Sequence, residues 1–117
     1  MKKRFKKIYI EIPSHIKGYE VKVIGIRAFG GSRDIDKLDL PSTVEKIENR
    51  AFEHTSIYEI KLSEGLKYIG ENAFSRCSNL KGDLIIPDTV TIIYDGAFNS
   101  CSGFDGRLKI SENLMFL

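Results

Sequence analysis

The sequence predicts a parallel solenoid, a fold in which each repeat forms one coil and equivalent positions stack along the axis. Two observations predict it. The dipeptide Ala-Phe recurs at intervals of 23, 22 and 24 residues, and other positions recur in register with it. Between these dipeptides lie short segments in which apolar residues alternate, as in strands with one buried face. We therefore expect a parallel β-sheet of short strands on one face, with turns and short 3₁₀ or helical segments on the other.

Four apolar or small columns accompany the dipeptides, which begin at Ala28, Ala51, Ala73 and Ala97. Seven residues before each Ala stand Val21, Val44, Leu66 and Val90, and four before it stand Ile24, Ile47, Ile69 and Ile93. A small residue follows at Ser32, Thr55, Cys77 and Cys101, and a large apolar one at Ile35, Ile57, Leu80 and Phe104. One coil cannot bury such an apolar face alone, but stacked coils can, so these columns predict the core.

The strands are predicted from alternating apolar pairs that end in Pro or Ser. They are Ile10-x-Ile12, Leu38-x-Leu40, Ile60-x-Leu62, Leu84-x-Ile86 and Leu108-x-Ile110. Proline ends a strand because it has no N–H for the ladder. Strands of successive coils should pair in parallel about 4.8 Å apart. The turns before them vary in length: the one after Thr55 is shortest, and the longer ones carry Gly82 and Gly106.

The rest of each coil returns the chain to the next strand. The Val-x-x-Ile segment is expected to turn the chain while keeping its apolar groups inside. Ala-Phe-x-x-small suits one helical or 3₁₀ turn, with Phe filling the core and Ala allowing close approach. The first coil is longer, and its Lys17-Gly18-Tyr19 segment indicates a hairpin-like turn, typical of a modified capping coil.

Length and composition predict one domain without catalytic or nucleic-acid signatures. The chain has 117 residues and a net charge of +2, too small to indicate nucleic acid or an anionic membrane. A basic lead over residues 1–7 precedes a single solenoid over 8–117. We divide the solenoid into a modified first coil 8–37, repeats at about 38–59, 60–83 and 84–107, and an incomplete last coil 108–117. No apolar stretch approaches the roughly 20 residues of a membrane helix.

These columns resemble the BspA-like leucine-rich repeats, also called the Treponema pallidum type. Ile86-Pro87-Asp88-Thr89-Val90 through Phe98 and Cys101 matches that family's unit, as does Leu40-Pro41-Ser42-Thr43-Val44 through Phe52. The irregular opening, from Ile12-Pro13 to Ile24-Gly25, is also similar. The sequence departs from the family at Ser32 and Thr55 in place of Cys, and at Glu48 and Tyr94 in place of Gly.

The resemblance implies a leucine-rich repeat solenoid that works in adhesion or in binding host proteins, at a bacterial cell surface or in secreted form. No signal-peptide segment is recognised, since Ile8 to Pro13 is too short and carries a charge. A cytoplasmic location is therefore the alternative. The expected partner is a protein or glycan.

Cysteines and histidines receive structural interpretations. Cys77 and Cys101 share a column, so a disulfide is within reach, but we favour a ladder of small buried thiols interchangeable with Ser32 and Thr55. His15 and His54 lie outside the core columns and have no ligand-spaced neighbours, so surface positions are favoured over metal binding. No phosphate loop or paired nucleophile and base is present. We therefore predict no enzyme activity, cofactor or metal.

The strand residues that alternate with the core form the open sheet face, and they are the candidate partner-binding residues. One row is Tyr9, Lys37, Glu59, Asp83 and Arg107, and the next is Glu11, Asp39, Lys61, Ile85 and Lys109. In-register stacking would place opposite charges side by side at Lys37–Glu59, Asp83–Arg107 and Asp39–Lys61. The face is then either a solvated, self-compensating surface or a ligand-binding surface.

The incomplete last coil predicts an uncovered end. Leu114, Phe116 and Leu117 could fold back as a cap, the end could pair with another copy, or the chain could be part of a longer array. We hypothesise self-association through this end, which makes a self-assembling structural unit the alternative to a binding module.

Overall fold

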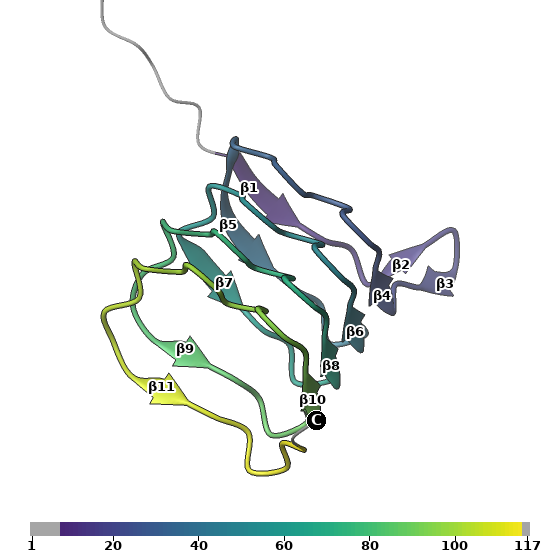
Figure 1. Ribbon diagram of the computed structural model, residues 1–117. Helices are drawn as coiled ribbons and strands as arrows, with labels where there is room; N and C mark the ends of the chain where they lie inside the picture. The colour runs from purple at the N-terminus through teal and green to yellow at the C-terminus, as the bar shows by residue number, and fades with distance from the viewer. Residues whose placement is uncertain (1–7, 116–117) are drawn as a thin grey trace, which may run out of the picture.

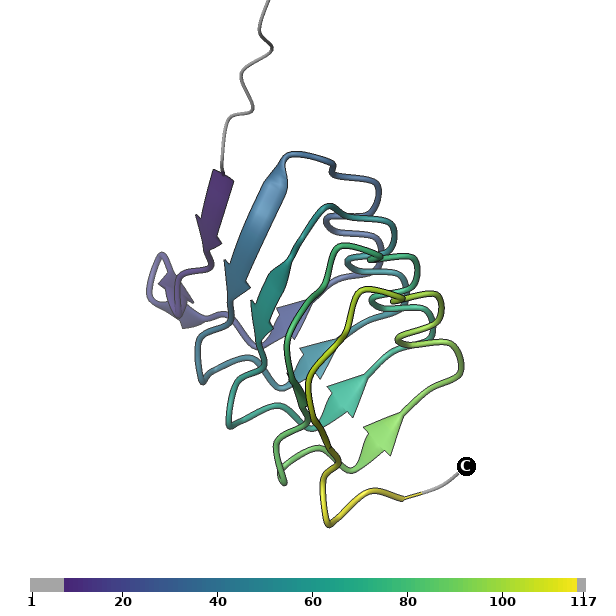
Figure 2. The same ribbon diagram turned by 90° about the vertical axis from the view of Figure 1, so that its left-hand side faces the viewer.

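The strands form parallel sheets on two sides of a stack of coils (Figures 1 and 2). The computed structural model describes residues 8–115, with the backbone alone for residues 8–10. On the first side, β1 (Ile8–Glu11), β5 (Ile35–Asp39) and β7 (Glu59–Lys61) form one sheet, and β9 (Leu84–Ile85) pairs with β11 (Leu108–Lys109). On the second side lie β4 (Val23–Ile24), β6 (Lys46–Ile47), β8 (Tyr68–Ile69) and β10 (Ile92–Ile93). The predicted parallel solenoid is confirmed.

The second sheet was not foreseen in the sequence. The Val-x-x-Ile segments were predicted only to turn the chain, but their last two residues pair in parallel from coil to coil, as in Ile47 with Ile69. The Ile of each pair faces the core, so the same positions supply both a buried column and a backbone ladder. Each of these strands has two residues, which is why their side chains show no readable period of two.

The Ala-Phe segments form single hydrogen-bonded turns, and no helix is present in residues 8–115. Within each turn the N–H of Ala donates to the residue three before it, as from Ala51 to the carbonyl of Glu48 at 3.2 Å. The residue before each Ala has a positive φ, at Arg27, Arg50, Asn72 and Gly96. A second such column follows at Gly31, His54, Arg76 and Ser100. These left-handed residues interrupt the turn, so it cannot continue as a 3₁₀ or α-helix.

The core consists of the predicted columns. Val44, Leu66 and Val90 are fully buried, and the rings of Phe29, Phe52, Phe74 and Phe98 stack with centroids 5.2, 5.2 and 5.3 Å apart. Each such aromatic pair contributes about 0.5–1.5 kcal/mol beyond the area it buries. In the Phe column burial is incomplete only at the ends of the stack: Phe29 and Phe98 are half-buried, whereas Phe52 and Phe74 are inaccessible.

The first coil carries the predicted hairpin. β2 (His15–Ile16) and β3 (Tyr19–Glu20) form an antiparallel pair. Lys17 and Gly18 connect them, with positive φ angles of 52° and 85°. Figure 1 shows the hairpin projecting sideways from the corner beside β4. It leaves the turn side of the first coil uncovered, since Ala28 is exposed where the equivalent Ala51, Ala73 and Ala97 are buried.

The sheet on the first side is divided, contrary to the prediction that strands of all successive coils pair. β7 and β9 belong to successive coils but share no hydrogen-bonded ladder. The stretch from Thr55 to Ile60 is two residues shorter than the equivalent stretch from Cys77 to Leu84. β9 and β11 follow stretches of equal length, and they pair with each other. The division therefore occurs where this stretch changes by two residues, whereas β5 and β7, whose stretches differ by one residue, still pair.

Close stacking of the coils predicts a cost for any side chain at Gly70. A Cβ there would lie 2.7 Å from the backbone of Asn49 and Glu48, whereas nothing lies within 4 Å of the equivalent position in Gly25. We expect Gly70→Ala to lower the free energy of unfolding by about 1–3 kcal/mol. Gly25→Ala is the matched control and should be neutral or slightly stabilising. Urea unfolding followed by circular dichroism measures both, and equal stabilities would contradict the packing described.

Candidate surface for partner binding

The side chains of the two predicted rows that the structure describes, from Glu11 onward, lie on the outer surface of the first side. Tyr9 pairs by its backbone with Lys37, and Lys37 with Glu59. Glu11 pairs with Asp39, Asp39 with Lys61, and Ile85 with Lys109. The structure thus brings neighbours of each row together, but the break between β7 and β9 separates the first three members of each row from the last two.

Two of the three predicted ion pairs are present. The Lys37 ammonium lies 2.8 Å from the carboxylate of Glu59, and the Arg107 guanidinium lies 3.4 Å from that of Asp83. Asp83 also accepts the backbone N–H of Arg107 at 2.6 Å, and this bond, with the guanidinium, holds the pKa of its carboxyl below the ordinary value. Asp39 and Lys61 are register partners. Such exposed pairs each contribute about 0–1 kcal/mol, so they set register more than stability.

A groove of about 340 Å³ lies where the sheet is divided. Ile60 and Leu84, both half-buried, line it from the two strands, and Ile85 stands on its rim with 45% of its surface exposed. Lys61 and Lys109 line the same groove on either side of Ile85 in the second row. Sequence reasoning placed Lys61, Ile85 and Lys109 on the face and Ile60 and Leu84 in the core, and it did not predict a groove. The change of repeat length after Cys77 was the available signal.

The cysteines form the favoured thiol ladder. Both are free, and the Cys77 thiol donates to the carbonyl of Phe52 at 3.1 Å while that of Cys101 donates to the carbonyl of Phe74 at 3.0 Å. Thr55 occupies the same column, with its hydroxyl 3.3 Å from the Cys77 sulfur. Burial raises the pKa of Cys77, and burial together with the neighbouring Cys77 raises the pKa of Cys101 to about 11. A raised pKa disfavours the nucleophilic thiolate.

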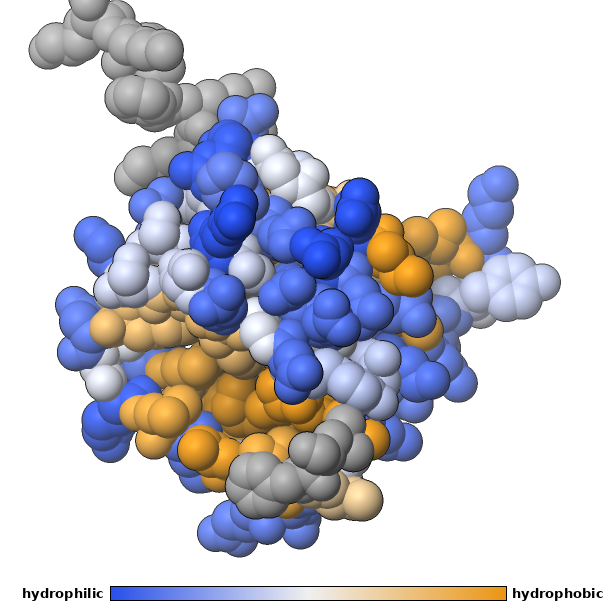
Figure 3. Space-filling model, in the orientation of Figure 1, coloured by the Kyte–Doolittle hydropathy of each residue, from blue (hydrophilic) through white to orange (hydrophobic). Residues whose placement is uncertain are grey.

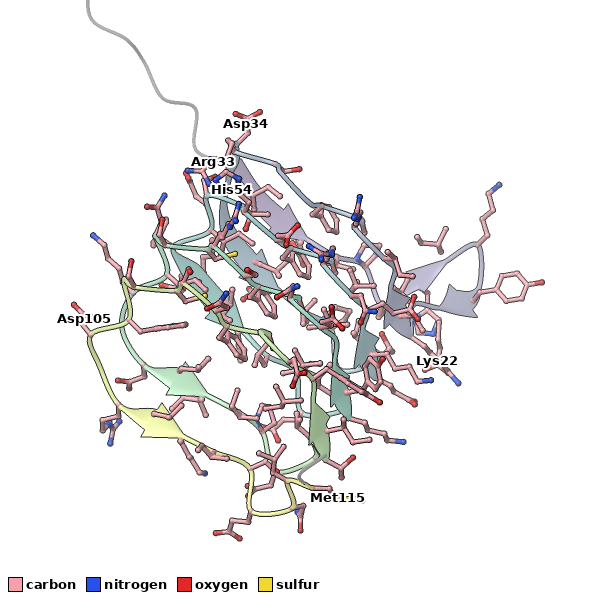
Figure 4. All side chains as sticks on the ribbon, viewed as in Figure 1. Lys22, Arg33, Asp34, His54, Asp105 and Met115 are labelled. Carbon is pink, nitrogen blue, oxygen red and sulfur yellow. The ribbon has the colours of Figure 1, made fainter. Side chains whose placement is uncertain are left out.

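The histidines occupy exposed positions on different coils. His15 lies at the base of the hairpin, where its Nδ1 is 2.9 Å from the Ser14 hydroxyl. His54 takes one of the left-handed turn positions, with φ of 55°. Figure 4 shows it beside Arg33, whose guanidinium donates to the His54 carbonyl at 3.4 Å. Within residues 8–115 no three potential ligands gather into a metal site.

The C-terminal end of the stack is apolar and uncovered in the described residues. Leu108, Ile110 and Met115 expose 62%, 51% and 59% of their surfaces, although the first two occupy core columns. Figure 3 shows apolar surface gathered over this end, and Figure 4 places Met115 beside β10. Leu114 packs against the core of its own chain. Phe116 and Leu117, the other predicted self-association residues, lie outside the described residues, as does the basic lead.

No helix in residues 8–115 is long and apolar enough to span a membrane. A sequence model described as the BspA type leucine-rich repeat region matches residues 2–115 in 6 copies. No curated protein sequence is significantly similar to the chain.

Two solved structures are similar. A leucine-rich repeat protein of T. pallidum superposes with a TM-score of 0.57 at 21% identity, covering 91% of this chain and 70% of that one. A leucine-rich repeat protein from Bacteroides ovatus gives a TM-score of 0.38 at 20% identity, and its match covers 92% of this chain and 46% of that one. The first of these likenesses supports the fold.

The thiol ladder predicts a loss of stability in alkali. Because the folded-state pKa of Cys101 is raised to about 11, the folded chain keeps its proton where an unfolded thiol, with a pKa of about 8.5, has lost it. The free energy of unfolding should therefore fall as the pH rises from about 8.5 towards 11. Cys101→Thr removes the thiol and introduces the residue that the same column has at Thr55. It should reduce the slope of the unfolding free energy against pH. Urea unfolding at several pH values measures it, and an unchanged slope would contradict the assignment.

Proposed function

The chain belongs to the BspA-type leucine-rich repeat family, and on that premise we propose that it is a non-catalytic module that binds a protein or glycan partner on its sheet face. The arrangement of that face is the observation that carries the proposal. Outward side chains of β5 and β7, and those of β9 and β11, lie in aligned rows within each half of the face, and Lys37, Glu59, Asp83 and Arg107 form ordered charge pairs among them. An aligned surface of this kind offers a partner many contacts at one coil spacing.

The difference in variability between buried and exposed positions supports the same proposal. The buried columns repeat with little change, whereas the rows on the face change from coil to coil in charge and size, as from Lys61 to Ile85. A surface whose scaffold is uniform can vary its exposed residues without altering the fold. We place the module at the cell surface or in secreted form, on the basis of the family resemblance.

Charge reversal on the face tests the proposal. The variant Lys37→Glu with Arg107→Glu breaks both ion pairs and adds negative charge to each half of the face. Binding to a glycan array and to a panel of purified extracellular proteins should fall at least about tenfold, because truncated or reversed interface charges typically cost more than 1.4 kcal/mol.

The matched control is Lys46→Glu with Lys67→Glu, which makes the same charge change on or next to the second sheet and breaks the Lys67–Glu45 pair. This control should bind as the wild type does. Equal affinity of the face variant and the wild type would reject the face as the binding surface. An equal loss of binding in both variants would show that binding responds to the net charge alone.

A second function, self-assembly into a structural unit, is favoured by the C-terminal end. In inner coils the turn N–H groups donate to the next coil, as Asn72, Phe74 and Arg76 do to carbonyls 2.7–3.1 Å away. The equivalent N–H groups of Gly96, Phe98 and Ser100 have no acceptor in residues 8–115. These donors on the turn side and exposed Leu108 and Ile110 on the strand side lie at the C-terminal end of the stack, where they offer a second copy backbone bonds and apolar surface.

Self-assembly predicts that the molar mass rises with concentration in light scattering. Leu108→Glu with Ile110→Glu places two charges on the end and should give a monomer at every concentration. The control Tyr58→Glu with Ile85→Glu alters exposed apolar residues of the middle coils, away from both ends of the stack, and should leave the mass unchanged. A wild-type chain that stays monomeric at high concentration would refute this second function.

A further inference from the structure

The groove between β7 and β9 is an opening in the middle of the sheet, bounded by two strands of the same chain. The N–H of Lys81 still donates to the Tyr58 carbonyl at 3.0 Å just before the strands begin, so the two coils are in contact at that point. Beyond it the strands separate, and no ladder joins them. The groove therefore lies between two successive coils and opens along the length of their strands.

Hydrogen bonds to the next coil hold β9 in its separated position. The N–H of Gly82 donates to the Asp105 carboxylate at 2.8 Å, and the N–H of Gly106 donates to the Gly82 carbonyl at 2.9 Å. The left-handed φ of 76° at Gly82 directs these bonds. Because the longer corner of this coil is tied to the equally long corner that follows, β9 aligns with β11 and not with β7.

The edge of β9 that borders the groove has backbone groups available for a ligand. The N–H groups of Leu84 and Ile86 donate to Arg107 and Lys109, each at 2.9 Å. Successive residues of a strand direct their backbone polar groups to opposite sides, so the N–H and C=O of Ile85 face β7. β7 pairs only with β5 among the described strands, which leaves its other edge open to the same groove. A ligand that satisfies both edges must carry donors and acceptors at strand spacing, as an extended peptide does.

The rim of the groove indicates the charge of that peptide. Lys61 and Lys109 stand on either side of Ile85, and within residues 8–115 neither ammonium lies in an ion pair. Two of the carboxylates in the lining already have partners. Asp83 accepts from Arg107, and Asp88 accepts the backbone N–H of Glu112 at 3.0 Å. Glu64, the third, follows the end of β7 by three residues. The two ammonium groups therefore lie level with Ile85 in the second row, whereas Asp83 precedes β9 and Glu64 and Asp88 each follow the end of a strand by three residues.

We propose that this groove binds an extended peptide segment that carries an acidic side chain. The peptide backbone bonds to the facing edges of β7 and β9, its apolar side chains contact Ile60 and Leu84, and its carboxylate pairs with Lys61 and Lys109. This inference rests on the proposed function, because it names the part of the sheet face that receives a protein partner and the chemistry that the partner brings.

Titration with defined peptides tests the inference. The probe is a short, end-blocked peptide of alternating valine and glutamate, added to ¹⁵N-labelled chain and followed by the backbone amide signals. The signals of Lys61, Ile85 and Lys109 should move. The valine–lysine peptide should bind at least about tenfold more weakly, because it places ammonium groups beside the lysines. A valine–glutamate peptide N-methylated at alternate residues should also bind at least about tenfold more weakly, because it lacks backbone donors.

Variants of the chain separate the two components of binding. Lys61→Glu with Lys109→Glu should invert the preference between acidic and basic peptides, whereas the control Lys22→Glu with Lys81→Glu, outside the groove lining, should not change it. Ile85→Pro removes the N–H that faces the groove and keeps both ladder donors to β11, so it should weaken both peptides. Ile85→Val is its control. Should the proline variant unfold, the methylated peptide tests the same backbone bonds.

Several outcomes would overturn the inference. Signal changes confined to other parts of the chain would move the site elsewhere. Equal affinity for the methylated peptide would make the groove a carboxylate site without strand pairing. An acidic oligosaccharide that moves the same signals while the peptides do not would make it a glycan site. A final outcome is that the peptides fail to bind while reversal of Lys37 and Arg107 still abolishes binding in the protein panel. That outcome would reject the groove inference and leave the proposed function standing.

Discussion

The hydrogen bond from each Phe N–H to the Ala carbonyl of the next coil is the interaction on which the rest of the structure depends. It joins Phe29 to Ala51, Phe52 to Ala73 and Phe74 to Ala97, at 2.7–2.8 Å. Left-handed residues on both sides of each dipeptide turn these N–H groups towards the neighbouring coil. Each bond fixes the coil spacing, and the stacked Phe rings and buried Ala residues fill the space that this spacing leaves. Without Ala at that column the backbones could not approach closely enough to bond.

Within residues 8–115, this ladder gives the inner coils hydrogen-bonded neighbours on both sides, whereas each end coil has such a neighbour on one side. The middle coils bury Val44, Phe52, Leu66 and Phe74 entirely, whereas equivalent residues at both ends are partly open. The first coil adds a hairpin that projects beside the stack, and within residues 8–115 the last coil adds a strand and the following turn. The apolar groups and free donors at the C-terminal end follow from translational stacking, because each coil supplies the partner for the one before it.

The coils differ mainly in the length of the corner that precedes the strands of the first sheet. The turn ladder and the second sheet keep the coils in contact despite that difference, so its effect is confined to the first side. Where two corners match, as at Gly82 and Gly106, they bond to each other and their strands pair. Where they differ by two residues, between β7 and β9, the sheet opens and leaves Ile60 and Leu84 half-buried, whereas a difference of one residue between β5 and β7 does not open it. A change of two residues in a surface corner thus shapes the candidate binding face without disturbing the core.

The sequence by itself determined the repeat, its buried columns, the strands of the first side, the hairpin at Lys17-Gly18 and the ion pairs Lys37–Glu59 and Asp83–Arg107. These follow from the spacing of side chains, because in-register stacking brings equivalent positions together. Only the tertiary structure decided the second sheet, the left-handed residues at Arg50 and His54, and the opening between β7 and β9. Those features depend on whether backbone groups of neighbouring coils can reach each other, and side-chain periodicity carries no information about that reach.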